Sequence, residues 1–255
     1  MIAENKYGTA EIQNALFEII LEFHKFCVEN NIQYGLYGGS CLGAIRHNGF
    51  IPWDDDLDIV VDRENYKKLI NKFHVCENLS MHRTIWIQRI QKNGAKEING
   101  YVPTLDVFVV DNVPKNKVVF KVKIFILLML QGMLKEEINY GKVSTLYKVC
   151  LFVTHFIGKL FPKKLVRKWY DSVSQLGNKE EAEFVHCTNT SFRCLPRKYK
   201  ADTWKKMVLH EFEDVKLFIP EKYEQYLSVM YGNYMDLPKE DQRIPEHAKK
   251  CGGKE

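Results

Sequence analysis

The chain repeats apolar residues at two different periods, and these periods separate its helices from its strands. Between residues 12 and 27 the apolar residues recur every three or four positions, which predicts a helix with one buried face that ends near Glu29. A second helix is predicted over residues 63–73, with Asp62 as its N-terminal cap. Both apolar faces are typical of core packing, so neither helix by itself indicates a binding site.

Runs rich in β-branched and aromatic residues alternate with these helices. They predict strands at residues 34–37, 54–61, 84–90 and 101–110, and Asn93-Gly94 predicts a turn. The last third is expected to hold a helix over 204–210, an edge strand over 212–219 and a helix over 223–231 that stops at Gly232. This mixed order predicts an α+β fold, a mixed β-sheet flanked by helices.

Between residues 117 and 169 the pattern changes to long apolar runs that Lys121, Lys123 and Lys148 interrupt. No run gives a clean span of about 20 apolar residues, so no transmembrane helix is predicted. A basic stretch follows, and two interpretations stay open: a helical subdomain with a solvated basic face, or a surface that lies on an anionic membrane. The basic residues of this stretch are Lys159, Lys163, Lys164, Arg167 and Lys168.

The densest group of acids lies at the start of the second predicted strand. Alternate side chains of a strand share a face, so Asp54, Asp56 and Asp58 are expected to project together while Asp55 points the other way. Like charges held so close need a counter-charge, and a divalent cation that prefers oxygen ligands is the usual partner. An acidic run is more often a solvated loop, but this one leads directly into the apolar run that ends at Val61. The segment therefore predicts a magnesium site.

A Gly-Gly-Ser turn precedes the acids and predicts a place for a phosphate. Gly38 and Gly39 allow positive φ and the close approach of a ligand, and Ser40 is expected to cap a short helix over residues 41–47. Free N–H groups at a helix start favour an anion. Gly-Gly-Ser alone is more often only a tight turn; beside the acids it favours nucleotide chemistry.

Composition and charge narrow the class of protein. The 255 residues are 45% hydrophobic and 27% charged, as expected of a globular protein, and the formal net charge of +5 suits an anionic substrate or membrane surface without requiring nucleic acid. The seven cysteines form no CxxC pair, so we interpret them as reduced thiols, and the spacing of His186, Cys187 and Cys194 does not favour zinc. The first residues lack a signal-peptide pattern, so we expect a cytoplasmic location. Contact with the inner face of the cell membrane is compatible with this expectation.

Three separated motifs resemble one family. The segment from Leu42 to Val61, LGAIRHNGFIPWDDDLDIVV, is similar to the signature of the LicD family, the phosphorylcholine-transferase branch of the nucleotidyltransferase superfamily that is related to fukutin. Gly39-Ser40, Asp56 and Asp58 match the superfamily pattern, and Asp106 in TLDVFVVD matches its third carboxylate. The block YGNYMDLP, with Arg243 and His247, resembles the C-terminal signature of the family, although Asn233 stands where Asp is usual.

The resemblance implies a fold, a domain plan and a cofactor. It implies a nucleotidyltransferase-like α+β fold with a catalytic core at residues 1–116, a helical insertion at 117–178 and the C-terminal part of the same domain at 179–255. Asp56, Asp58 and Asp106 would be the catalytic and metal-binding carboxylates, holding Mg²⁺, in one or two copies, with Mn²⁺ as a substitute.

The implied reaction is transfer of phosphocholine from CDP-choline to a hydroxyl of a cell-surface glycan, a lipid-linked glycan or a teichoic-acid precursor. Asp106 would share a second metal or take the proton of the acceptor. A quaternary ammonium is bound by aromatic rings, and Trp53 is favoured among the candidates. The other candidates are Tyr37, Tyr101, Tyr231 and Tyr234. The full set of expected substrate-binding residues is Gly38, Gly39, Ser40, Arg46, His47, Trp53, Tyr231 and Tyr234.

Three rival functions stay open at this point. The same fold could transfer another CDP-linked phosphoalcohol, such as a polyol phosphate. It could instead pass the nucleotide itself to a small acceptor, and the bond of the diphosphate that breaks would separate these two reactions. The third rival is a binding protein that keeps the fold without catalysis, which the complete set of Ser40, Asp56, Asp58 and Asp106 disfavours.

Overall fold

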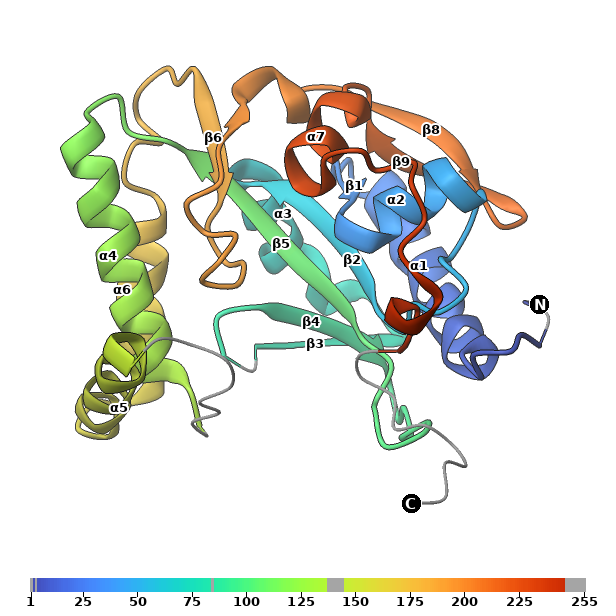
Figure 1. Ribbon diagram of the computed structural model, residues 1–255, viewed down its shortest axis with the longest axis horizontal. Coiled ribbons are helices and arrows are strands. Elements are labelled where there is room, and N and C mark those ends of the chain that lie inside the picture. Colours follow the sequence, from blue (N-terminus) through green and yellow to red (C-terminus); the bar gives the residue numbers. More distant parts are fainter. Residues whose placement is uncertain (1, 3, 84, 137–144, 246–255) are drawn as a thin grey trace. The chain divides into compact units, whose positions relative to one another are not determined.

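A computed structural model describes residue 2 and residues 4–83, 85–136 and 145–245 (Figure 1). The chain divides into two compact units, and each is described by itself. Unit one comprises residues 1–82, 88–108 and 202–255, and unit two comprises residues 83–87 and 109–201. The domain boundaries predicted at residues 116 and 178 concern the plan of the family domain and stay a prediction.

Unit one is built on a mixed set of strands, which confirms the α+β class. Neighbouring strands follow the order β1 (Gly35–Leu36), β2 (Leu57–Asp62), β5 (Leu105–Asn112), β4 (Gln88–Lys92) and β3 (Leu79–Arg83). β1 is antiparallel to β2, and β4 is antiparallel to the first half of β5. β2 and β5 each lie between two neighbouring strands in this order, and both are mostly buried and rich in valine.

The helices of unit one cover these strands. α1 (Ala10–Glu29) contacts β4, and both α2 (Gly38–His47) and α3 (Arg63–Lys72) contact β2. The side chain of Asp62 accepts a hydrogen bond from the Asn65 N–H at 2.7 Å, which confirms the predicted cap of α3. α7 (Tyr223–Tyr231) contacts α2, and the hairpin of β8 (Met207–Phe212) and β9 (Val215–Pro220) lies beside β1. Short 3-10 turns are Phe73–Val75, Ala201–Trp204 and Glu240–Gln242.

Unit two joins strands and three helices. The second half of β5 pairs with β6 (Phe184–Cys187), which pairs with β7 (Tyr199–Lys200). The helices expected between residues 117 and 178 are α4 (Lys117–Leu134), α5 (Thr145–Lys159) and α6 (Lys163–Ser174). A core that includes Leu127, Leu134, Val166, Tyr170 and Leu195 joins α4 to α6. Among the described helices, none combines the length and the apolar composition that spanning a bilayer needs.

Several predicted boundaries are wrong. The strand expected over 84–90 begins only at Gln88, and β3, whose polar sequence LSMHR gave no strand signal, precedes it. Most of the helix expected over 204–210 is instead part of β8, which pairs with β9. The two strands are joined by a two-residue turn at Glu213 and Asp214. Propensity misled here because a hairpin is stabilised by its partner strand, which a local pattern does not show.

Candidate active site

The turn after β1 brings the predicted glycines against the predicted acids. Gly38 has a φ of +54°, which a residue with a side chain adopts only with strain. A Cβ atom built on Gly38 would lie 2.9 Å from Oδ2 of Asp58, and one on Gly39 would overlap Oδ2 of Asp54. The two glycines thus give the carboxylates room beside the backbone. The positive φ that we expected is found at Gly38 and not at Gly39.

Ser40 has a different role from the predicted cap. α2 begins at Gly38 with Tyr37 as its N-cap residue, so Ser40 lies inside the first turn of the helix. Its Oγ accepts a hydrogen bond from the Asp58 N–H at 2.8 Å, and the Tyr37 N–H donates to the Asp58 carbonyl at 2.9 Å. The prediction of a cap is wrong because the helix starts three residues earlier than its apolar pattern. The serine instead fixes the backbone that carries Asp58.

The acidic loop is held from α1. Gln13 donates from Nε2 to the Ile51 and Asp54 carbonyls at 3.0 and 2.8 Å, and the Thr9 hydroxyl donates to the Pro52 carbonyl at 2.7 Å. β2 begins at Leu57, so the predicted strand start at residue 54 is wrong, and Asp54 and Asp56 belong to this tethered loop. Sequence reasoning missed Gln13, since a single buried amide in a helix has no distinctive local pattern.

Asp58 carries an unusual electrostatic load. Burial of its carboxyl raises its pKa well above the ordinary value, and Asp56, Asp106 and Asp54 raise it further, while Arg89 lowers it. Asp55 is fully buried. It precedes β2, so the strand alternation behind its predicted opposite orientation does not apply to it. Asp56 and Asp106 are therefore both close enough to Asp58 to affect its carboxyl electrostatically.

Asp106 has a cationic partner that the sequence analysis missed. Arg89 on β4 is the register partner of Asp106 on β5, and its Nε and Nη2 donate to the two carboxylate oxygens at 3.0 and 3.4 Å. The Asp106 side chain is 17% exposed, so this ion pair is partly screened. No local signal marks Arg89, because its meaning comes from the pairing of two strands.

The carboxylates around Asp58 are the kind of ligands that a hard divalent cation binds, but they are not yet arranged as a metal centre. All the groups around Asp58 that raise its pKa are carboxylates, and carboxylate oxygens are the ligands that Mg²⁺ prefers. Across the described ranges, however, no three His, Cys, Asp or Glu side chains already stand in the arrangement of a metal centre. Asp106 already accepts two hydrogen bonds from Arg89, so a cation bound there would share this carboxylate with the guanidinium. In these same ranges His186 and Cys187 form no zinc cluster with Cys194.

Tyr231 reaches the acids from α7. Tyr231 as a whole residue is 43% exposed, whereas its hydroxyl would lie 3.8 Å from a Cβ on Gly38. Desolvation of the hydroxyl raises the pKa of Tyr231, and Asp58, Asp54 and Asp56 raise it further, so it stays a protonated donor at neutral pH. Another tyrosine of α7, Tyr226, was not predicted; its hydroxyl accepts a hydrogen bond from the Gly38 N–H at 2.7 Å.

The remaining predicted residues gather around Trp53 and the C-terminal loop. The guanidinium of Arg243 lies 5.4 Å from the centroid of the Trp53 ring, and His47 packs edge-on against the same ring. Arg46 donates from Nη1 to the carbonyls of Tyr234 and Asp236, both at 3.1 Å. Arg46 and Tyr234 thus tie α2 to the loop after α7, and their predicted role toward a phosphate stays a prediction. His247 lies outside the described residues.

The charge state of His47 follows from its position. Burial, together with the neighbouring charge of Arg46, lowers the pKa of His47 to about 4. The imidazole is therefore neutral at pH 7, and its buried Nδ1 has no hydrogen-bond partner within the described part of the chain. A neutral ring can pack against Trp53 but adds no charge for a phosphate.

Comparison with known proteins relates the segment that contains these residues to a family. The family model described as LicD/FKTN/FKRP, nucleotidyltransferase domain, matches residues 31–126, a range that contains the glycine turn, the acidic loop, Arg89 and Asp106. The lipopolysaccharide cholinephosphotransferase LicD of Haemophilus influenzae is 27% identical over 95% of this chain and 97% of its own length. An uncharacterised protein of Rickettsia typhi is 33% identical over 29% of this chain and 25% of its own length. An uncharacterised protein of Rickettsia prowazekii is 43% identical over 20% of this chain and 19% of its own length. The family model over residues 31–126 and the near full-length similarity to a cholinephosphotransferase together support a phosphotransferase of the LicD type.

Proposed function

We propose that the protein transfers phosphocholine from CDP-choline to a hydroxyl of a cell-surface glycan or teichoic-acid precursor, with Mg²⁺ held by Asp56 and Asp58. The observation that carries the proposal is the Asp58 carboxyl, which is desolvated and faces three further carboxylates against one guanidinium. The similarity to a cholinephosphotransferase over nearly the whole length of both chains supports the choice of group transferred.

The reaction would form a bond between the acceptor oxygen and the phosphorus of phosphocholine while the bond to CMP breaks. A carboxylate would take the proton of the acceptor hydroxyl. Asp106 is the candidate because it lies near Asp58 and could give up a hydrogen bond from Arg89 to accept this proton. A bound Mg²⁺ would supply charge stabilisation for the diphosphate and the leaving CMP.

The protein's own groups would orient the donor around this centre. The Tyr231 hydroxyl stays protonated beside Asp58 and is placed to donate a hydrogen bond to a phosphate oxygen. Ser40 and the Tyr37 N–H hold the Asp58 backbone at both its N–H and its carbonyl, so the carboxylate is positioned before substrate arrives.

One observation favours a second candidate, the transfer of a different CDP-linked phosphoalcohol such as a polyol phosphate. A choline headgroup would need an open aromatic face, and the Trp53 ring already faces the guanidinium of Arg243. A polyol would bind through hydrogen bonds and would leave this pair in place. Choline therefore requires either displacement of Arg243 from Trp53 or a different aromatic ring.

The test is incubation with Mg²⁺, a glycan acceptor and a panel of CDP-choline, CDP-ethanolamine, CDP-glycerol and CDP-ribitol, with the products followed by ³¹P NMR. We expect CMP release with CDP-choline, loss of that release in EDTA and a fall of about 10³-fold in Asp58→Ala. CMP release that is unchanged in Asp58→Ala would show that the wrong carboxylate has been named. Release of free phosphocholine with CMP attached to the acceptor would instead show nucleotidyl transfer.

A further inference from the structure

Helix α5 turns its most apolar side to the solvent. Its packed positions, Leu151, Thr154, His155 and Gly158, include two polar residues and a glycine. Its outward positions are large and apolar: Phe152 is 48% exposed and Phe156 51%, and Val149, Val153 and Ile157 are exposed on the same side. Leu160, the residue after the helix, is 78% exposed. A helix on the surface of a globular protein normally shows the reverse distribution.

The contact between α4 and α5 fixes this orientation. A Cβ atom on Gly132 of α4 would overlap Oγ1 of Thr154, and one on Gly158 of α5 would overlap the carbonyl of Met133. The two helices therefore meet along their small residues. His155 extends the contact through a hydrogen bond between its Nδ1 and the Lys135 carbonyl at 3.0 Å. A rotation of α5 that hid its phenylalanines would replace these close contacts with clashes.

The apolar surface continues into the start of α6. Phe161, Leu165 and Trp169 are each 37% exposed, and the rings of Phe161 and Trp169 meet edge-on with centroids 5.3 Å apart. On α5 the rings of Phe152 and Phe156 lie 4.6 Å apart. These residues of α5 and α6, from Val149 to Trp169, are here called the α5–α6 apolar face.

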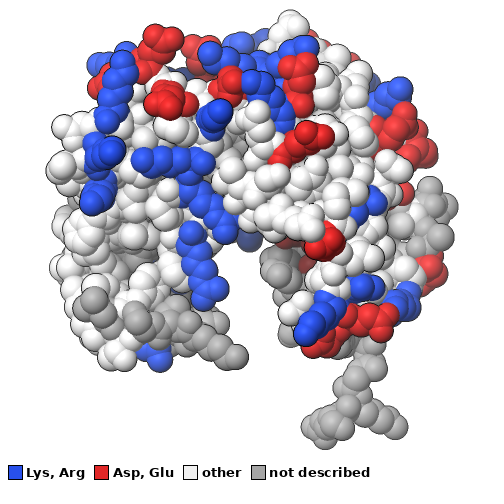
Figure 2. All heavy atoms as spheres, turned by 45° about the horizontal axis from the view of Figure 1, so that its top comes forward, with Lys and Arg blue, Asp and Glu red and all other residues white. Residues whose placement is uncertain are grey.

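Basic residues border this face. The exposed Lys164 and Lys168 stand one position before Leu165 and Trp169 on α6, and the Nζ of Lys159 lies 5.1 Å from the centroid of the Phe156 ring. Unit two as a whole contains 18 Lys and Arg and 7 Asp and Glu, which gives it a formal charge of +11. Since the whole chain has a formal charge of +5, unit one has a formal charge of −6. The left half of Figure 2, where α4, α5 and α6 lie in Figure 1, shows this excess of Lys and Arg.

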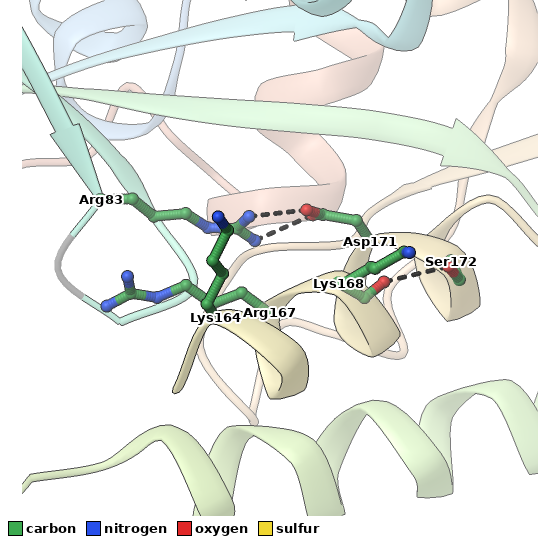
Figure 3. Close-up of a pocket in the computed structure, with 6 residues that line it drawn as sticks. All are labelled: Arg83, Lys164, Arg167, Lys168, Asp171 and Ser172. Carbon is green, nitrogen blue, oxygen red and sulfur yellow. Dashed lines mark hydrogen bonds and ion pairs between the residues drawn. The ribbon is translucent and has the colours of Figure 1, made fainter. Parts of the chain in front are cut away.

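A cavity of about 450 Å³ opens beside the basic edge of α6 (Figure 3). Arg83 and Asp171 line it as a two-bond ion pair with distances of 2.7 and 2.9 Å, and Arg167 is anchored by a bond from its Nε to the Ile85 carbonyl at 3.3 Å. Lys164, Lys168 and Ser172 complete the lining. Four cations against one carboxylate give the cavity a net positive charge, which suits a phosphate group.

From these observations we propose that the α5–α6 apolar face is a docking surface for a membrane that contains anionic phospholipid. α5 lies in the plane of the interface with Phe152, Phe156 and Leu160 among the upper acyl groups, and the cavity on α6 takes a lipid phosphate. An apolar helix side bordered by lysines is the pattern of an interfacial helix. A second copy of this chain is a poor occupant because two units of +11 repel each other. The inference is independent of the donor and of the reaction proposed above.

The test is flotation of the full chain with vesicles of phosphatidylcholine, with and without 30% phosphatidylglycerol. We expect binding to the anionic vesicles at least tenfold stronger than to the neutral ones, and weaker binding at high salt. Phe152→Ser/Phe156→Ser should lower binding to anionic vesicles about tenfold or more, whereas Leu209→Ser, at a position 53% exposed on β8, should not. Lys164→Glu/Lys168→Glu should lower it similarly, whereas the matched pair Lys67→Glu/Lys68→Glu on α3 should not.

A second readout places the membrane at α6. Trp169 should be quenched by vesicles whose acyl chains carry bromine, and Trp169→Phe should remove most of that quenching. All these positions are exposed, so unchanged thermal melting of each variant shows that its fold is intact. Absence of wild-type binding to anionic vesicles, equal binding of the serine variant, or unquenched Trp169 would each overturn the proposal. Self-association through this face, or binding to an acidic soluble protein in preference to vesicles, would also overturn it.

Discussion

Asp58→Asn is the substitution that best separates the electrostatic account of the site from a purely structural one. Asparagine has the shape of aspartate, and the two backbone hydrogen bonds at this position, from the Asp58 N–H to Ser40 Oγ and from the Tyr37 N–H to the Asp58 carbonyl, do not involve the side chain. The change therefore removes one negative charge and leaves the local fold in place.

The expected size follows from the charges around the carboxyl. Asp58 faces three carboxylates and one guanidinium, an excess of two like charges. At an effective dielectric of about 20, two unit charges about 6 Å apart interact by roughly 3 kcal/mol. Proton uptake by the Asp58 carboxyl, whose pKa is raised, reduces this repulsion. Without metal we expect Asp58→Asn to raise the free energy of unfolding by about 1–3 kcal/mol, which is about 2–10 °C in Tm for a chain of this size.

Metal should reverse this order of stability. Mg²⁺ at 100 times its Kd stabilises the wild type by about 2.7 kcal/mol, whereas Asp58→Asn, which lacks a ligand, gains much less. The pKa of Asp58 is raised, so the native state binds more protons than the unfolded chain between the ordinary and the raised value. In EDTA the wild type should therefore lose stability as pH rises through that window, and Asp58→Asn should not.

The assay is differential scanning fluorimetry in EDTA and in Mg²⁺, with Glu64→Gln as the control. Glu64 is exposed on α3, and its substitution removes the same charge away from the cluster. The reasoning is refuted if Asp58→Asn is no more stable than the wild type in EDTA and both gain equally from Mg²⁺. In that case the carboxylates would be ordinary solvated acids.

Three further predictions use the same structure. Arg89→Met should tighten Mg²⁺ binding about fivefold in calorimetry, since it removes the positive charge beside Asp106; weaker binding would mean that Arg89 mainly positions that carboxylate. Gly38→Ala should lower the free energy of unfolding by about 1–2 kcal/mol because of its positive φ, and should also weaken Mg²⁺ binding because the new Cβ would press on Asp58. Gly94→Ala, with a φ of +71° and no atom within 4 Å of its Cβ, should lower stability alone. Equal Mg²⁺ affinities in the two variants would contradict the contact between Gly38 and Asp58. His186, fully buried with its pKa lowered to about 3, binds fewer protons in the native state than unfolded, so stability should fall as pH drops from about 6.5 towards 3; an unchanged acid-side slope of urea-unfolding free energies in His186→Asn would contradict this.

The sequence predicts those parts of the molecule whose cause is local. α1, α3 and α7 follow from apolar spacing and end signals, and the capping by Asp62 needs only its neighbour Asn65. The cluster of Asp56 and Asp58 can be predicted from the sequence, because acids that lead directly into a buried strand need a positively charged partner. The α+β class follows from the order of these elements.

The parts that were missed depend on contacts between distant segments. Arg89 gains its meaning only from the β4–β5 register, and Gln13 only from the loop that its amide holds. The sequence of β8 has no clear strand pattern of its own, because its partner β9 supplies the stabilisation. The outward side of α5 could not be assigned from composition, since its orientation is set by Gly132 of another helix.

The most direct test of the central claim is the anomalous scattering of Mn²⁺ in crystals grown with CDP-choline. The account predicts a peak between the carboxylates of Asp56 and Asp58, about 2.0–2.4 Å from an oxygen of each, with the diphosphate as a further ligand. A map with no peak at these carboxylates, in crystals where the nucleotide is bound elsewhere on the chain, would contradict it.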